Sequence, residues 1–277
     1  MISITKLPKY PIPPSPYCKH IYGQAESAQP RTPSADAHPP LTLDQNRELQ
    51  RDTLDEVWIP PKASVASRRP AKKSRASFRG SLVNPRTNRE IVFESIPERD
   101  LAYIALTTPS VADLREQVGP IEYVDENGEI HQHTIDLVAD MKSGTSAAFF
   151  VKPAKRVEPS GIRRTVNFIR SQQPSIANQF CIRTEEHITR DRSANARLLH
   201  RALRSRDSDD IAAVLGFANT LRGSMTIRDV LSVTRNDGFG FMALLCLIAD
   251  GVLEHVGPGR ISRNSFVRLS RTTETIV

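Results

Sequence analysis

The chain has 277 residues, a formal net charge of +7 and an isoelectric point near 9.5. This length suits one large or two modest domains, and the excess of positive charge favours a polyanionic partner, nucleic acid before membrane. The three cysteines lie far apart and form no CxxC pair, which argues against a disulfide framework and a cysteine zinc site. The longest apolar run, from Phe241 to Ala249, is too short to span a bilayer. We therefore expect a cytoplasmic protein without a signal peptide.

Residues 1–90 are predicted to be a disordered, proline-rich and basic region. Thirteen of the twenty prolines occur by Pro85, and nine basic residues with no acidic one lie between Lys62 and Arg89. Such a stretch resists collapse and suits sequence-independent contact with phosphates. A solvated linker or a localisation signal is an equally good interpretation.

Residues 91–204 are predicted to form an α/β domain. The pattern indicates a capped helix that begins after Ser95, and the Asn127-Gly128 pair is typical of a β-hairpin turn. The remaining expected elements are strands at 111–118, 121–125, 129–140, 147–152 and 179–183 and helices at 163–172 and 185–204. This order predicts a mixed sheet flanked by helices.

Residues 205–277 are predicted to be a winged-helix-like domain. Helices are expected at 209–221, 226–233 and 239–250, followed by strands at 252–256 and 261–269. The third helix is almost wholly apolar, so it has no polar face to present to base edges in a major groove. Protein docking is therefore at least as well supported as DNA reading for this domain.

Three polar residues carry the pattern of a metal-dependent nuclease. Glu98 lies in the first turn of a helix, Asp136 lies in a strand, and Lys152 ends an apolar strand. Strict alternation along strands groups Asp136 with Val138 and Lys152 with Phe150. If the two strands are neighbours, both groups project from one surface, where carboxylates can hold a metal on a scissile phosphate and a lysine can orient water.

Each residue also has a structural interpretation. Glu98 can close a capping box with Ser95, Asp136 can be an edge-strand carboxylate, and Lys152 can be a strand-end lysine. The pair His131 and His133 has a spacing that chelates zinc, but the sequence offers no third ligand beside it.

Short motifs in this region resemble the TnsA-like endonucleases of heteromeric cut-and-paste transposons. The matching segments are Asp113-Leu-Arg-Glu-Gln117, Asp136 before an apolar stretch, and Phe150-Val-Lys152-Pro-Ala154. The resemblance implies a restriction-endonuclease-like core in which Glu98 and Asp136 bind Mg²⁺, with Mn²⁺ as a substitute, and Lys152 orients the attacking water.

The resemblance also implies partners, and the chain departs from the family pattern at one position. The implied partners are double-stranded DNA at transposon ends, an integrase-type transposase subunit and an ATPase regulator, in a nucleoid-associated bacterial setting. The position two residues before the lysine is Gln or Glu in the family and is Phe150 here. This change leaves two hypotheses, an active endonuclease and a non-catalytic DNA-binding scaffold on a degenerate nuclease core.

Overall fold

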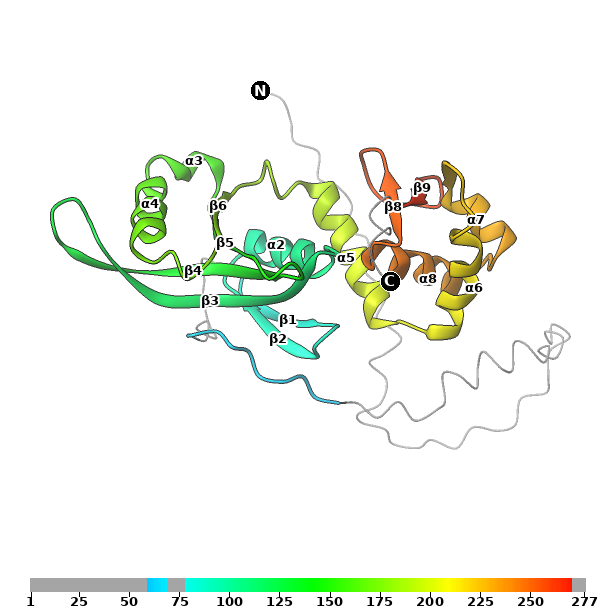
Figure 1. Cartoon of the computed structure of the whole chain (residues 1–277), viewed down its shortest axis with the longest axis horizontal. Coiled ribbons are helices and arrows are strands. Elements are labelled where there is room, and N and C mark those ends of the chain that lie inside the picture. Colours follow the sequence, from blue (N-terminus) through cyan, green and yellow to red (C-terminus); the bar gives the residue numbers. More distant parts are fainter. Residues whose placement is uncertain (1–58, 69–77, 271–277) are drawn as a thin grey trace, which may run out of the picture. The chain divides into compact units, whose positions relative to one another are not determined.

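A four-stranded mixed sheet lies at the centre of the α/β part of the chain (Figure 1). The structure, a computed structural model, describes residues 59–68 and 78–270. The strand order is β3-β4-β5-β6, with β5 and β6 parallel and the other pairs antiparallel. The strands are β3 (Val111–Val124), β4 (Ile130–Met141), β5 (Ser146–Val151) and β6 (Gln179–Arg183). The predicted mixed sheet is confirmed.

Helices cover both faces of this sheet. Helix α2 (Ile96–Leu106) packs on one face, α3 (Ala154–Val157) and α4 (Ile162–Gln172) pack on the other, and α5 (Arg190–Arg204) packs against α2. Ser95 caps α2, as predicted. The last helix begins five residues later than expected, because the hydroxyl of Thr189 accepts the N–H of Arg192 and caps it there.

Two apolar cores lie on opposite faces of the sheet. One core joins α2 to the sheet through residues such as Leu101, Leu137 and Val151. The other joins α4 to the sheet through residues such as Ile169 and Phe150. The sheet is therefore buried between helices near its middle, which places the strand ends, and any polar residues there, at the rim of the cores.

A hairpin precedes the position at which the sequence predicted that order begins. Strands β1 (Gly80–Asn84) and β2 (Arg89–Phe93) pair antiparallel and supply Leu82, Ile91 and Phe93 to the α2 core. The prediction that the first ninety residues are unfolded is thus wrong for this segment. The other parts of that prediction, for residues 1–58 and 69–77, lie outside the described residues.

Several cations of the basic N-terminal stretch have internal partners. Arg89 is buried and pairs with Glu116 and Asp113 at 3.1 Å each. Arg68 pairs with Glu94 at 2.9 Å. The stretch has no acidic residue of its own, so its local sequence does not indicate these ion pairs. The carboxylates of the pairs lie some 25 residues further along the chain.

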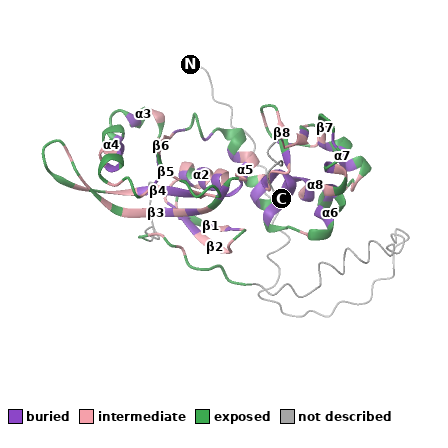
Figure 2. Ribbon diagram, viewed as in Figure 1, coloured by how far each residue is buried: buried purple, intermediate pink, exposed green. Residues whose placement is uncertain are grey.

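The C-terminal block contains three helices and a small sheet. Its elements are α6 (Ser208–Ala218), β7 (Ser224–Thr226), α7 (Ile227–Val233), α8 (Gly238–Ala249), β8 (Leu253–Val256) and β9 (Phe266–Leu269), with the strands in the order β7-β9-β8. The expected helices and the ribbon are present, and β7 is an additional strand. Most of α8 is buried, as its apolar sequence predicted (Figure 2).

Helix α5 belongs to both parts of the chain. Its Arg197 pairs with Asp100 of α2 at 3.0 Å, and its Leu199 and Leu203 pack in the core that contains α8.

Within the residues that the structure describes, there is no helix with the length and apolar character needed to cross a membrane.

Candidate active site

Strands β4 and β5 separate at Asp136. Their pairing runs from Asp140 with Ser146 to Leu137 with Phe149 and stops there. Beyond that point the backbone N–H of Val151 donates to a side chain, the Oδ2 of Asp136, at 2.7 Å. Lys152 directly follows Val151. The predicted site residues Asp136 and Lys152 are therefore neighbours at the opening between β4 and β5.

The alternation of side chains breaks at the same place. Ile135 and Val138 both lie in the α4 core, whereas Leu137 and Ala139 lie in the α2 core. The strict alternation that we assumed for this strand would place Ile135 and Leu137 on one face, so that assumption is wrong here. Strict alternation requires a regular ladder on both sides, and the ladder is irregular at Asp136.

Gln117 of the neighbouring strand β3 has an unusual backbone conformation, although the pairing register of β3 with β4 continues through it. Pairing passes from Glu116 with Leu137 to Val118 with Ile135, which places Gln117 across from Asp136. Gln117 has φ of 48°, a left-handed conformation that costs a non-glycine residue about 1 kcal/mol or more.

Contacts from a distant segment hold Gln117 in this conformation. The hydroxyl and backbone N–H of Ser67 both donate to its carbonyl oxygen, at 2.6 and 3.1 Å. Its side-chain oxygen accepts from Arg68 and its side-chain nitrogen donates to Glu98 Oε2, each at 3.3 Å. Gln117, buried at 1 % exposure, thus connects the segment 59–68 to the predicted catalytic glutamate.

Glu98 is held by three more short contacts. Its Oε1 accepts from the Ser95 hydroxyl at 2.8 Å, and its Oε2 accepts from the backbone N–H of Glu94 at 2.8 Å. Its own N–H donates to Ser95 Oγ at 3.3 Å. Glu98 therefore takes part in capping the helix, as one interpretation expected. Its carboxylate accepts the backbone N–H of Glu94, however, and not that of the cap residue Ser95. A carboxylate has about four lone-pair sites, so these contacts leave room for a further ligand.

Glu98, Asp136 and Lys152 interact electrostatically with one another. Burial, and then the charge of Glu98, raise the pKa of Asp136 from 3.8 to about 7, against the Val151 hydrogen bond and the charge of Lys152. Burial also raises the pKa of Glu98, against its hydrogen bonds and Lys152. The three predicted residues are thus brought together at one site, with two partly or fully buried carboxylates and one ammonium group.

Two further residues lie at this site: Glu94, which the sequence analysis did not single out, and His133, which it singled out only as half of a zinc pair. Glu94 adds negative charge beside both carboxylates. His133 lies beside Lys152, and burial together with that charge lowers its pKa, so the imidazole is neutral at pH 7. No local signal marks either residue as part of this site, because Glu94 reaches it from the bend that follows β2 and His133 from its place in β4.

Phe150 fills the α4 core and does not present a polar group. Its side chain is fully buried, and its ring centroid lies 5.5 Å from that of His133. The position at which the resembled family has Gln or Glu is therefore part of the apolar core in this chain.

We expect Phe150→Gln to lower the free energy of unfolding by about 3 kcal/mol, because it opens a cavity and buries an amide. Phe150→Leu, which stays apolar, should cost about 1 kcal/mol. Urea unfolding of both variants measures the difference. A Gln variant as stable as the wild type would mean that this side chain can turn out of the core.

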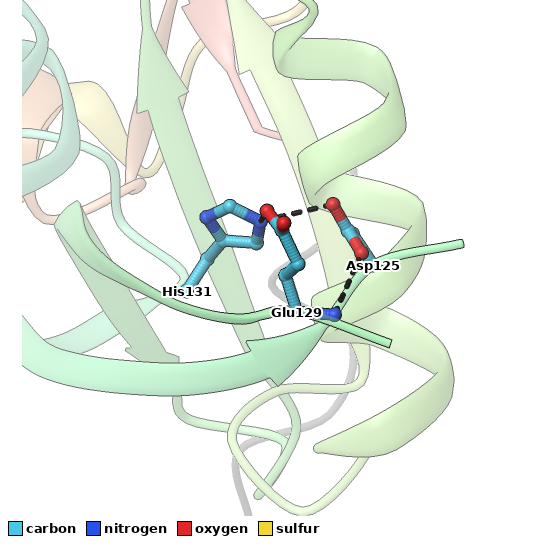
Figure 3. A group of neighbouring side chains, drawn as sticks. All are labelled: Asp125, Glu129 and His131. Carbon is cyan, nitrogen blue, oxygen red and sulfur yellow. Dashed lines mark hydrogen bonds and ion pairs between the residues drawn. The ribbon is translucent and has the colours of Figure 1, made fainter. Parts of the chain in front are cut away.

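A separate group of metal-capable side chains lies near the β3–β4 turn (Figure 3). Among residues 59–68 and 78–270, Asp125, Glu129 and His131 are the one set of three such side chains within 4.8 Å of one another. His131 Nε2 lies 3.0 Å from Asp125 Oδ2 and 3.9 Å from Glu129 Oε2. Asp125 also accepts the backbone N–H of Glu129 at 3.0 Å.

This turn group is distinct from the predicted site, and it shares only His131 with the predicted zinc pair. His131 is five residues before Asp136, about 16 Å along the strand. It associates with Asp125, whose pKa the hydrogen bond from His131 lowers, whereas its expected partner His133 packs on Phe150. The internal contacts of the turn account for the arrangement without a metal.

Comparison with known proteins finds no family whose model matches this chain and no curated protein that matches it. The interpretation of the site therefore depends on its own geometry and chemistry.

Proposed function

We propose that this protein is a Mg²⁺-dependent DNA endonuclease subunit of a TnsA-like transposition system, which hydrolyses phosphodiester bonds at transposon ends. One observation carries the proposal: the charge of Glu98 raises the pKa of the buried Asp136 carboxyl, and the charge of Lys152 acts on both carboxylates. Groups with perturbed pKa values that gather at one opening in a sheet are typical of catalytic sites.

The donor set fits a hard divalent cation. Two carboxylates that repel each other, with Glu94 adding further negative charge, leave a surplus that Lys152 alone does not neutralise. Mg²⁺ prefers a few carboxylate ligands together with water, and Glu98 and Asp136 are the residues that would hold it, with Mn²⁺ as a substitute. Bound there, the ion would supply Lewis acidity at the scissile phosphate.

The side chains of the chain supply positioning and charge. Hydrogen bonds from Ser95, Glu94 and Gln117 fix the Glu98 carboxylate in place before substrate arrives. The Val151 N–H fixes Asp136. The ammonium group of Lys152 is placed to orient a water and to offset negative charge as the phosphate is attacked.

The arrangement of helices and strands supports the two fold types that the proposal needs. A mixed sheet with helices on both faces, and carboxylates where two central strands separate, agrees with a restriction-endonuclease-like core. Three helices with a small sheet agree with a winged-helix-like C-terminal domain of residues 205–277.

The proposed partners follow from the resemblance and from burial. Double-stranded DNA at the element ends is the proposed substrate, and an integrase-type transposase is the proposed co-catalyst. Because most of α8 is buried and the rest of it is glycine or apolar, it offers no polar side chain to base edges, so we assign the C-terminal block to docking an ATPase regulator. Such a complex would act on the bacterial nucleoid in the cytoplasm.

The alternative is a non-catalytic DNA-binding scaffold, and Phe150 favours it. This position offers a phenyl ring in the core in place of a polar group at the metal. A main-chain oxygen near Lys152 can replace the missing ligand, since carbonyl oxygens suit hard cations. If the site is weakened rather than complete, restoring glutamine at position 150 should raise the cleavage rate despite its cost in stability.

Cleavage of a supercoiled plasmid that carries the element ends, with partner subunits present, tests the proposal. We expect cuts in Mg²⁺ or Mn²⁺, none in chelator, and none with Asp136→Ala because a metal ligand is lost. Asp140→Ala is the matched control: it removes the same charge from β4, but Asp140 pairs with Arg115 at 2.8 Å. A folded wild type that does not cut, or a cutting Asp136→Ala variant, would leave the scaffold alternative.

A further inference from the structure

An open cavity of about 580 Å³ lies between β1, α2 and α5, apart from the carboxylate site. Three arginines of α5 line it, Arg197, Arg201 and Arg204, together with His200 and Tyr103. No carboxylate lines it among the residues that the structure describes. A hollow with three guanidinium groups and no acidic lining is suited to an anion.

All three guanidinium groups can reach a ligand, because Arg201 and Arg204 are unpaired with carboxylates among the described residues and Arg197, which gives one N–H to Asp100, is exposed and keeps further donors. Arg197 donates to Asp100 at 3.0 Å, and that carboxylate also accepts from Arg99 at 2.8 Å. Arg201 and Arg204 are exposed, and within the described part of the chain neither has an ion-pair partner. The negative end of the helix dipole favours cations in this last turn, but it does not explain the hollow beside them.

A buried histidine, His200, forms part of the cavity lining. His200 is buried, its Nε2–H donates to the carbonyl of Val83 at 2.8 Å, and its ring packs edge-on against Tyr103 at 4.9 Å. Burial, and then the charge of Arg204, lower the pKa of His200, so this ring is neutral. The positive charge of the cavity therefore comes from its arginines at every pH near 7.

We propose that this cavity binds the phosphodiester backbone of duplex DNA, as a contact separate from the catalytic carboxylates. Seven residues of helix separate Arg197 from Arg204, a rise of about 10 Å, which matches about three nucleotides along one strand. An open row of this length suits a polymer better than a single phosphate. The inference rests on the proposed function, in which DNA is the substrate. It assigns to α5 a sequence-independent contact with the DNA phosphates.

Equilibrium binding of a fluorescent duplex to the full chain in chelator tests the inference, because no cleavage then occurs. Arg201→Gln/Arg204→Gln should lower the slope of log K against log salt by about 1.8, and weaken binding roughly 60-fold at about 0.1 M salt. Arg201→Lys/Arg204→Lys should restore most of the slope, since a phosphate contact needs the charge.

The matched control is Arg163→Gln/Arg164→Gln. It removes the same charge from exposed arginines of α4 that pair with Glu158 and Glu126, at 2.7 and 2.6 Å. An equal loss in the control, or no change in the α5 variant, would overturn the inference. Stabilisation of the wild type by inorganic phosphate that the α5 variant loses, with DNA binding unchanged, would also overturn it, in favour of a free phosphate.

The outcome is separable from that of the proposed function. If the wild type cleaves DNA and the α5 variant binds as tightly, the cavity assignment fails alone. If the α5 variant loses the salt slope and the control keeps it, but the wild type never cleaves, the endonuclease proposal fails while the cavity assignment stands.

Discussion

Replacing Lys152 with alanine is expected to lower the metal-dependent cleavage rate by about 100- to 1000-fold, the usual effect of removing one charge-stabilising group. Metal affinity should not fall, and should rise slightly, because the ammonium group opposes a cation beside Glu98 and Asp136. Calorimetric titration with Mn²⁺ and the plasmid assay measure the two quantities separately.

Two comparisons make this result diagnostic. Asp136→Ala should lose metal binding and cleavage together, because it removes a ligand. Lys155→Ala removes the same charge from an exposed position in α3 and should change neither. If Lys152→Ala cuts at the wild-type rate, the lysine is only the end of a strand, and its role in orienting water is wrong.

The elements with strong local signals were predictable from the sequence. The Asn127-Gly128 turn predicted the β3–β4 hairpin, and Gly128 has the left-handed φ of 82° that such a turn requires. Ser95 marked the beginning of α2, and the continuous apolar run marked α8 as a core helix. In each case the physical cause lies within a few residues of the element.

The features that were missed depend on contacts between distant segments. The β1–β2 hairpin has a buried arginine, Arg89, whose carboxylate partners Asp113 and Glu116 lie on β3. Strand β7 has three residues and exists because it pairs with β9. No local pattern distinguishes such segments from a basic linker or a loop.

The same reasoning explains why the residues of the site were predictable but their geometry was not. The chemistry of two carboxylates and a lysine can be inferred from residue type and order. The break in alternation at Asp136 cannot, because it accompanies a left-handed Gln117 that Ser67 holds from fifty residues earlier in the chain. Strain of this kind persists where surrounding contacts over-determine the backbone, often at functional sites.

Asp136→Asn is expected to stabilise the metal-free protein at pH 8 and to have little effect below about pH 4. The wild-type pKa of about 7 lies above the ordinary value of 3.8, so the folded state holds a proton that the unfolded state has released between these values. Stability of the wild type therefore falls as pH rises from about 4 to 7 and is level above. Asparagine does not titrate and can still accept the N–H of Val151.

The expected gain grows over this window to at most about 4 kcal/mol at pH 8, since each pH unit of the interval corresponds to about 1.4 kcal/mol. Urea unfolding in chelator at a series of pH values measures it. Asp140→Asn removes the same charge from the same strand but breaks the ion pair with Arg115, so it should give no gain at pH 8.

Mg²⁺ should reduce or reverse the difference in stability between Asp136→Asn and the wild type at pH 8. A cation beside Glu98 and Asp136 favours the ionised carboxylates, so adding Mg²⁺ at pH 8 should stabilise the wild type more than the Asn variant. A gain from Asp136→Asn that is equal at pH 4 and pH 8 would contradict the assignment of a buried, charge-crowded carboxylate. A wild type whose stability is indifferent to Mg²⁺ at pH 8 would contradict the metal site itself, because a ligand that binds the folded state must stabilise it.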